Sequence, residues 1–364
     1  MNKKKLVIIF WDLGIGGIQK RIRDITLEIS KKHPDWSIYI LLRNKKEESF
    51  MNQITHVNNI NILFYPFGKN YIRLPLGFIY WIFFMYVQLR ADIILTFLPP
   101  LSVIVLIIHK LLFFIPTKVI VNDGVYITTY LKFRNQEWIK PLITLTYRFA
   151  YKIIVPTNAC NQVLQKTFSI PCENINVIPN WTLIKKTKKM QPIYDLLYIG
   201  RFEKEKNVLS IVEITKNISL VFPNIQVLLV GSGSQYSNLQ TLIKNENLTA
   251  NIFLHQFDSN IGNFLRRSSI LVFPSFSEGM PNVVLESAMY QLPTVTMNFP
   301  GVEDVVLNEE TGYICKTSEE MSKRIIYLLK NGSTRNKMGT SAQRFVESNF
   351  HTETQKRFVK TILE

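Results

Sequence analysis

Short apolar runs alternate with longer amphipathic segments along the whole chain of 364 residues. The runs are rich in Ile, Leu and Val, which is typical of strands buried in a parallel sheet, and the segments between them have helical periodicity. The pattern therefore indicates an α/β protein in which helices cover parallel sheets. We expect strands at 6–11, 38–43, 62–65, 93–98, 118–122, 152–156, 175–179, 195–200, 225–231, 251–257, 270–275 and 292–297.

The alternation is interrupted once, by a basic polar stretch at 185–192. This stretch predicts a linker between an N-terminal domain (1–184) and a C-terminal domain (193–344), with a helical tail at 345–364. Each domain has the doubly wound pattern, and the two are expected to face each other across a cleft. Such sheets bind ligands at the carboxyl ends of their strands, so the loops at those ends are the candidates for chemistry.

The positive charge of the chain is confined to its first half. The net charge is +16, and residues 1–190 contain 26 Lys and Arg against 10 Asp and Glu, whereas residues 191–364 contain 17 of each kind. A basic half indicates an anionic partner, such as an anionic membrane, a phosphate-bearing acceptor or a nucleic acid. The sequence has no zinc finger, basic-region heptads or aromatic RNA-binding signature, so we expect no nucleic acid.

An uncharged run in the basic half, Leu74 to Leu89, bears on membrane contact. Its densest part, 76–87, has twelve residues, fewer than the roughly 20 needed to span a bilayer. It predicts either a helix buried against the sheet or a face that dips into the membrane interface.

The first apolar run of the chain is too short for a signal-peptide core. Three cysteines without CxxC spacing indicate reduced core thiols of a cytosolic protein: Cys160, Cys172 and Cys315.

The segment 270–295 carries the strongest chemical signal. A strand ends at Ser275, a short loop holds Glu278 and Gly279, and a helix starts near Pro281. Proline at the first helical position is preorganised, and the free N–H groups of a helix start bind anions. Glu286 lies further along this helix, from where its carboxylate could reach back toward a ribose. Taken alone, two glutamates at this spacing are weak evidence for a site and favour one solvated side chain and one that complements the helix dipole.

Two further segments follow strands of the same half. In GRFEKEKN (200–207), Arg201 and Lys206 flank a turn and could stabilise a departing diphosphate, whereas Lys204 is expected to be a surface charge paired with a neighbouring glutamate. In VGSGS (230–234), Gly231 and Gly233 permit close backbone approach.

In this order, these segments resemble the retaining GT-B glycosyltransferases of glycosyltransferase family 4. The resemblance implies two facing Rossmann-like domains, with the nucleotide held mainly by the C-terminal one, and a C-terminal helix that crosses back to the N-terminal domain. It implies no cofactor and no metal ion. It assigns the donor diphosphate to Arg201 and Lys206, the donor sugar to Glu278 and the ribose to Glu286. The donor-binding residues it adds are Gly231, Gly233, Gly279, Met280 and Asn282.

The N-terminal half resembles the family less closely. DLGIGGIQ (12–19) is similar to the family's glycine-rich loop, with Gly16 and Gly17 as donor-binding residues, but Gln19 stands where many members have Glu. The family's acceptor-side His is missing, and the corresponding loop, VNDGV (121–125), offers Asp123 as the candidate base. His109 lies in an apolar helical run and is expected to be a core histidine.

The resemblance implies transfer of a hexosyl unit from a UDP- or GDP-sugar to a glycan acceptor, with retention of configuration. The basic, apolar N-terminal half favours a lipid-linked acceptor, as in capsule or O-antigen (lipopolysaccharide) assembly. Such an enzyme would be cytoplasmic and peripheral on the inner face of the cytoplasmic membrane. Two alternatives remain: an NADP-dependent oxidoreductase, with Arg43 near a 2′-phosphate, and a non-catalytic protein that binds nucleotide sugars.

Overall fold

The computed structural model describes residues 3–14, 16–45, 50–66, 75–185, 190–258 and 260–364. Three features of the sequence fall partly outside these residues: the centre of the expected linker (186–189), Ile15 of the expected glycine-rich loop and Leu74 at the start of the uncharged run.

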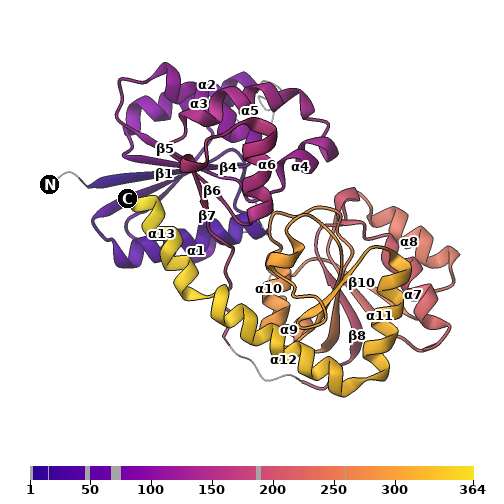
Figure 1. Ribbon diagram of the computed structural model, residues 1–364. Coiled ribbons are helices and arrows are strands. Elements are labelled where there is room, and N and C mark those ends of the chain that lie inside the picture. Colours follow the sequence, from indigo (N-terminus) through magenta and orange to yellow (C-terminus); the bar gives the residue numbers. More distant parts are fainter. Residues whose placement is uncertain (1–2, 15, 46–49, 67–74, 186–189, 259) are drawn as a thin grey trace. The chain divides into compact units, whose positions relative to one another are not determined.

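The chain folds into two compact units (Figure 1). The N-terminal unit comprises the residues up to Ile178 together with Gln355–Glu364, and the C-terminal unit comprises Pro179–Thr354. The sequence placed the boundary at 184. Residues 179–184 belong to the C-terminal unit because they bond to it; the Thr182 backbone N–H, for example, donates to the Phe350 carbonyl at 2.9 Å.

The N-terminal unit is built on a seven-stranded parallel sheet of order β3-β2-β1-β4-β5-β6-β7. Its strands are β1 (Lys4–Phe10), β2 (Trp36–Leu42), β3 (Ile60–Phe64), β4 (Ile93–Phe97), β5 (Lys118–Asn122), β6 (Lys152–Val155) and β7 (Ile175–Val177). Its helices are α1 (Gly17–Lys32), α2 (Pro75–Leu89), α3 (Pro99–Leu111), α4 (Ile127–Phe133), α5 (Lys140–Thr146), α6 (Asn158–Phe168) and most of α13 (Thr352–Leu363). Helices α2, α3 and α5 lie on one side of the sheet, and α1 and α13 lie on the other (Figure 1).

The C-terminal unit repeats the plan with a six-stranded parallel sheet of order β10-β9-β8-β11-β12-β13. Its strands are β8 (Tyr194–Ile199), β9 (Val227–Val230), β10 (Ile252–His255), β11 (Ser268–Phe273), β12 (Thr294–Met297) and β13 (Gly312–Cys315). Its helices are α7 (Ser210–Ser219), α8 (Tyr236–Asn245), α9 (Gly262–Leu265), α10 (Asn282–Met289), α11 (Ser318–Lys330) and α12 (Gly332–Asn349). In both sheets the strand order reverses beside the first strand, at β1/β4 and at β8/β11. Doubly wound sheets open a ligand crevice at such a reversal.

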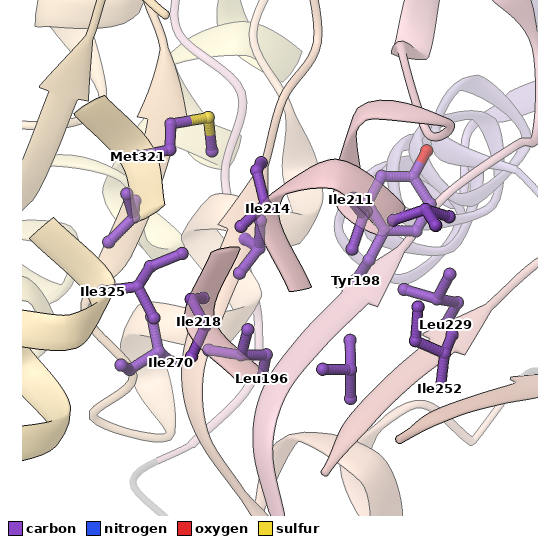
Figure 2. Close-up of a cluster of buried hydrophobic side chains, with 14 of the residues drawn as sticks. Leu196, Tyr198, Ile211, Ile214, Ile218, Leu229, Ile252, Ile270, Met321 and Ile325 are labelled. Atoms are coloured by element: carbon purple, nitrogen blue, oxygen red, sulfur yellow. The ribbon is translucent and has the colours of Figure 1, made fainter. Parts of the chain in front are cut away.

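Both faces of the second sheet are buried, which explains the continuous apolar runs of its strands. Leu196 and Tyr198 of β8 and Ile270 of β11 point into one cluster, with Ile214 of α7 and Ile325 of α11 among its members (Figure 2). The alternate residues of the same strands face the opposite side, where α10 and α12 contribute to the packing.

The expected fold class is confirmed, since both units carry a parallel, Rossmann-like sheet with helices on its two faces. All twelve expected strands are present, and β13 is one that the sequence analysis missed. The expectation of core thiols holds for Cys160 and Cys315 but is wrong for Cys172, which is exposed. Among the described residues, no helix is both long and apolar enough to cross a membrane.

Candidate functional site

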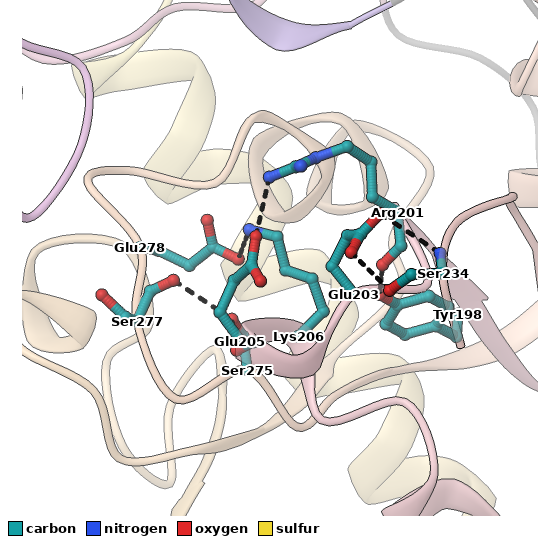
Figure 3. Close-up of polar contacts among 9 residues, drawn as sticks. All are labelled: Tyr198, Arg201, Glu203, Glu205, Lys206, Ser234, Ser275, Ser277 and Glu278. Carbon is teal, nitrogen blue, oxygen red and sulfur yellow. Dashed lines mark hydrogen bonds and ion pairs between the residues drawn. The ribbon is translucent and has the colours of Figure 1, made fainter. Parts of the chain in front are cut away.

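Three loops converge at the carboxyl edge of the second sheet, beside the β8/β11 reversal. They are the segments singled out from the sequence: the loop after β8 carries Arg201 and Lys206, the loop after β9 carries Gly231 and Gly233, and the loop after β11 carries Glu278. Because β9 and β11 are the two neighbours of β8, residues far apart in the sequence meet here (Figure 3).

An ion pair connects two of the expected catalytic residues. The Lys206 ammonium donates to Glu278 Oε1 at 2.6 Å, and the two side chains are only 15% and 12% exposed. Lys206 ends a short 3-10 turn (Lys204–Lys206), which is closed by Asn207 in the left-handed conformation at φ 51°. The turn thereby directs the ammonium toward the loop after β11. A positive and a negative charge thus lie side by side, mostly shielded from water.

Glu205 ties the loop after β11 to the loop after β8. Its carboxylate accepts from the more exposed Arg201 guanidinium at 3.0 Å, and its backbone carbonyl accepts from Phe276 N–H at 3.0 Å. The Ser275 hydroxyl donates to the same carbonyl at 3.3 Å (Figure 3). The sequence analysis gave Glu205 no role, because its partners become neighbours only once the strands are ordered.

Glu203 holds the loop after β9, which carries Ser234. Its carboxylate accepts from the Ser234 hydroxyl at 2.7 Å and from the Ser234 N–H at 3.3 Å. Lys204 is exposed, as expected, but its expected pairing with a neighbouring glutamate is wrong, because Glu203 bonds to Ser234 and Glu205 bonds to Arg201.

Buried Tyr198 supports the turn from beneath. Its hydroxyl donates to the Arg201 carbonyl at 3.0 Å, and burial, followed by the charge of Glu278, raises the pKa of Tyr198 well above its usual value. The hydroxyl therefore stays protonated and keeps this bond. Tyr198 was not identified from the sequence, where it looks like any aromatic residue of a core strand.

The glycines after β9 have a packing role. A Cβ at Gly231 would lie 1.9 Å from the Gly200 carbonyl oxygen, and a Cβ at Gly233, where φ is +153°, would lie 2.5 Å from the Phe202 oxygen. The backbones of the two loops also bond directly, from Phe202 N–H to the Ser232 carbonyl at 2.8 Å. Only glycine allows this approach, which brings the loops after β8 and β9 together.

The helix after the third loop starts one residue later than expected. Pro281 is the N-cap, with an extended backbone, and α10 begins at Asn282, so the expectation of Pro281 at the first helical position is wrong. Asn180 holds this start: its amide donates to the Met280 carbonyl at 2.7 Å and to Asn282 Oδ1 at 2.8 Å. Gly279 and Glu286 are both buried.

The remaining expected residues belong to the N-terminal unit. Gly16 and Gly17 precede and begin α1 after β1, and Asp123 follows β5, with β4 between those two strands. Asp123 is buried and accepts from the Tyr147 hydroxyl through Oδ2 at 2.9 Å. Burial raises the pKa of Asp123 to about 7, against the effect of that hydrogen bond.

Two other expectations concern individual residues of this unit. His109 is partly buried and bonds to the Tyr86 hydroxyl at 2.7 Å, as befits a packed histidine, and burial lowers its pKa. The Arg43 guanidinium lies over the rings of Trp11 and Phe78, at 5.5 and 5.8 Å from their centroids. Within the described residues, no three His, Cys, Asp or Glu side chains gather as a metal site.

Both halves of the chain match family models. The model described as Glycosyl transferases group 1 matches residues 179–345, and that described as Glycosyltransferase Family 4 matches residues 15–182. The chain is 27% identical over 161 residues to the capsular polysaccharide biosynthesis glycosyltransferase CapM of Staphylococcus aureus, covering 43% of this chain and 42% of that one. It is 25% identical over 223 residues to the amylovoran biosynthesis glycosyltransferase AmsD of Erwinia amylovora, covering 59% and 60%.

Similarity to solved structures extends over the full length. Anabaena Alr3699/HepE, crystallised with UDP and glucose, superimposes with a TM-score of 0.81 at 15% identity, covering 99% of both chains. The matches to curated sequences are shorter, and the chain spans about half the length of the relatives that it matches first, 42–52%. The fold is thus that of the structural neighbours, and both domain models agree with it. The chain belongs to the GT-B glycosyltransferases of glycosyltransferase family 4.

Proposed function

We propose that the protein is a retaining hexosyltransferase that uses a UDP- or GDP-sugar, with UDP favoured, and extends a lipid-linked glycan in cell-surface polysaccharide assembly, such as that of a capsule or O-antigen. The observation that carries the proposal is the Lys206–Glu278 pair beside Arg201 at the β8/β11 reversal. Two observations on similar proteins also support the proposal: Alr3699/HepE was crystallised with UDP and glucose, and CapM and AmsD are named for polysaccharide biosynthesis.

In this proposal, Arg201 and Lys206 bind the donor diphosphate. An ammonium has three N–H donors, so Lys206 can keep its bond to Glu278 while it binds a phosphate oxygen. The two cations then stabilise the charge that develops on the leaving diphosphate, which is where electrostatic catalysis acts. Glu278, fixed by Lys206, accepts hydrogen bonds from the donor sugar hydroxyls. Glu286 binds the ribose, and the backbone at Gly279, Met280 and Asn282 lines the same loop.

The transfer breaks the bond between the sugar anomeric carbon and the diphosphate oxygen and forms a bond to an acceptor hydroxyl on the same face. The departing diphosphate helps take the acceptor proton, in a front-face route that needs neither a covalent intermediate nor a metal ion. Asp123 is the candidate acceptor-side base in the N-terminal unit, where Gly16 and Gly17 start α1. The lipid-linked acceptor places the enzyme on the inner face of the cytoplasmic membrane.

A thermal-shift screen of UDP, GDP, their sugar conjugates, NAD and NADP, without added metal, tests the donor site. We expect UDP or GDP to raise the melting temperature of the wild type and of Lys204→Ala, because Lys204 is exposed on the same turn. Lys206→Ala should lose the shift. This variant also leaves Glu278 without its bonded lysine, which can change the melting temperature of the ligand-free protein. The shift of each protein is therefore measured from its own melting temperature without ligand.

Turnover provides the second readout. Lys206→Ala should lower kcat/KM by roughly a hundredfold or more, as expected when a group that stabilises the leaving charge is removed. Stabilisation by NADP alone would assign the protein to the oxidoreductases. Nucleotide binding without any transfer or donor hydrolysis would assign it to the non-catalytic binders.

A further inference from the structure

Helices α2 and α3 form an apolar outer face on the N-terminal unit. An open groove of about 530 Å³ runs between them, and every residue that lines it is aliphatic or aromatic. Leu76, Tyr80 and Phe83 line it from α2, and Ile104, Ile107 and Leu111 line it from α3. Residues of this kind normally pack into a core, and a contiguous exposed set marks an interaction surface.

The fold does not need this face for its own packing. The inner side of α2 already covers the sheet, where Ile82 and Met85 are buried against β1 and β4. Helix α2 carries no charged residue along its 15-residue length. Its outer side chains, such as Tyr80 and Phe84, are therefore exposed apolar groups on a helix that is apolar all round, which a soluble unit normally avoids.

The turn after α3 extends the face. Phe113 and Phe114 are 77% and 69% exposed, and their rings contact each other edge to face at 6.0 Å. The Tyr86 hydroxyl bonds to His109 Nδ1 at 2.7 Å and links α2 to α3, so the two walls of the groove are held together. We call the exposed residues of α2, α3 and this turn the α2–α3 face.

The segment of the chain that carries the α2–α3 face is basic. Residues 75–152 contain three acidic residues, of which Asp123 is buried, and eight basic ones. The basic residues are Arg90, Lys110, Lys118, Lys132, Arg134, Lys140, Arg148 and Lys152. Some interleave with aromatic rings: Lys110 lies 4.9 Å from the Phe149 ring, and Lys118 lies 4.4 Å from the exposed Tyr151 ring. Apolar side chains flanked by lysine, arginine and aromatic rings are typical of surfaces that sit in a lipid interface.

We propose that the α2–α3 face docks on an anionic lipid bilayer, with α2 and α3 lying in the interface and Phe113 and Phe114 inserted among the acyl chains. Fifteen residues make a helix of roughly 22 Å, which is too short to span the hydrocarbon layer, so α2 lies on the membrane and does not cross it. The inference deepens the proposed function and rests on its lipid-linked acceptor: docking brings the enzyme to the surface that holds this acceptor.

Lipid fits the face better than a protein partner does. Protein interfaces surround an apolar centre with a rim that supplies directed hydrogen bonds, whereas this groove has one hydroxyl among its lining side chains, that of Tyr80. A second copy of the chain is also disfavoured, because a two-fold contact would place two basic flanks against each other. Anionic headgroups complement those flanks.

Flotation of the full chain with phospholipid vesicles tests the inference. We expect binding to vesicles that contain about one third phosphatidylglycerol, weaker binding at high salt and little binding to pure phosphatidylcholine. The double variant Phe113→Ser, Phe114→Ser should raise the apparent dissociation constant at least about tenfold. The matched control is Leu220→Ser, Val221→Ser, an adjacent exposed apolar pair of the C-terminal unit with Leu220 82% exposed, which should bind as the wild type does.

The outcomes separate this inference from the donor-site proposal. Vesicle binding is measured without nucleotide, and the UDP or GDP thermal shift should be the same in both double variants. If Phe113→Ser, Phe114→Ser fails to fold, Tyr80→Ser with Leu111→Ser removes two other exposed side chains of the α2–α3 face. Wild type that ignores anionic vesicles, equal binding by a folded face variant, or a dimer that the face variant dissociates would each overturn the inference.

Discussion

At the scale of the residue, Asp123 is the group whose environment is most at odds with its chemistry. Its side chain is buried, Oδ2 accepts from the Tyr147 hydroxyl, and Oδ1 has no hydrogen-bond partner among the described residues. Both side-chain polar atoms of the adjacent Asn122 are likewise without a partner there. Two neighbouring buried polar side chains in this state are costly to the fold, which favours a functional reason for keeping them.

The raised pKa of Asp123 predicts a pH-dependent stability. With a folded-state pKa of about 7 and an unfolded value near 3.9, the folded protein holds a proton that the unfolded chain has lost. The stabilisation is therefore complete below about pH 4 and is lost as the pH rises through 7. Asp123→Asn has no such proton, so its free energy of unfolding should lack this dependence on pH. Relative to the wild type, the variant should therefore become more stable by a few kcal/mol as the pH rises from about 4 through 7.

Urea unfolding of both proteins at several pH values measures this difference. Asp35→Asn, at an exposed position of the same unit, is the control for removing one negative charge. A difference between Asp123→Asn and wild type that is the same at pH 4.5 and pH 8 would show that Asp123 titrates normally. Loss of transfer activity in Asp123→Asn, without loss of stability, would support its role on the acceptor side.

The residue types of the site were predictable from the sequence, but their partners were not. Arg201, Lys206 and Glu278 stand in local motifs at strand ends, so they can be found by reading along the chain. The contact between Lys206 and Glu278 spans 72 positions, and that between Glu203 and Ser234 spans 31. These contacts depend on β9 and β11 flanking β8, an order that the spacing of apolar runs does not contain.

At the scale of the element, helix α12 packs closely enough to require glycine. A Cβ at Gly339 would lie 2.1 Å from the backbone oxygen of Gln291, at the end of the turn after α10. That oxygen belongs to the main chain and cannot swing aside, so Gly339→Ala forces the helix and the turn apart. We expect a loss of about 1–3 kcal/mol in the free energy of unfolding, as for other overpacked cores.

The same helix offers the matched control. Gly332 begins α12, and a Cβ there would meet only the end of the Arg335 side chain at 3.7 Å, an ordinary contact. Gly332→Ala should therefore be neutral or stabilising, by up to about 1 kcal/mol, because alanine favours the helical backbone. Chemical denaturation of both variants checks the opposite signs. A Gly339→Ala protein as stable as Gly332→Ala would mean that α12 does not pack as described.

Elements with strong periodicity were predictable, and those without it were not. The twelve expected strands coincide with apolar runs of the sequence, whereas β13 is Gly-Tyr-Ile-Cys, which starts with a strand-weakening glycine. For α2, the uncharged run allowed either a buried helix or an interfacial one. Helix α2 has a buried apolar side, which confirms the buried helix, and an exposed apolar side, for which the interfacial position stays a prediction.

At the scale of the whole molecule, the N-terminal unit is formed by two separate segments of the chain. After the C-terminal unit is complete, Gln355–Glu364 returns to the N-terminal unit and finishes its packing. The Gln355 amide donates to the Asp24 carbonyl at 3.0 Å, and the Arg357 guanidinium donates to the Val177 carbonyl at 2.6 Å. The sequence indicated a helical tail, and only the family resemblance implied its return, because ten amphipathic residues do not specify which sheet they cover.

This return predicts that the stability of the N-terminal unit depends on one side chain near the end of the chain. Phe358 is fully buried, and the Arg21 guanidinium lies over its ring at 5.2 Å. Phe358→Ala removes that ring from the core and should cost roughly 3–5 kcal/mol in the unfolding of this unit. Lys360→Ala, two positions away on the exposed side of α13, should change the stability by no more than about 0.5 kcal/mol.

Calorimetry with and without UDP or GDP distinguishes the units, since a nucleotide bound at the β8/β11 reversal raises only the transition of the unit that contains it. If Phe358→Ala and Lys360→Ala have the same melting transitions, the last ten residues add nothing to the stability of the N-terminal unit. If Phe358→Ala alone lowers the transition of the N-terminal unit, which is the one that the nucleotide does not raise, these residues are part of its core.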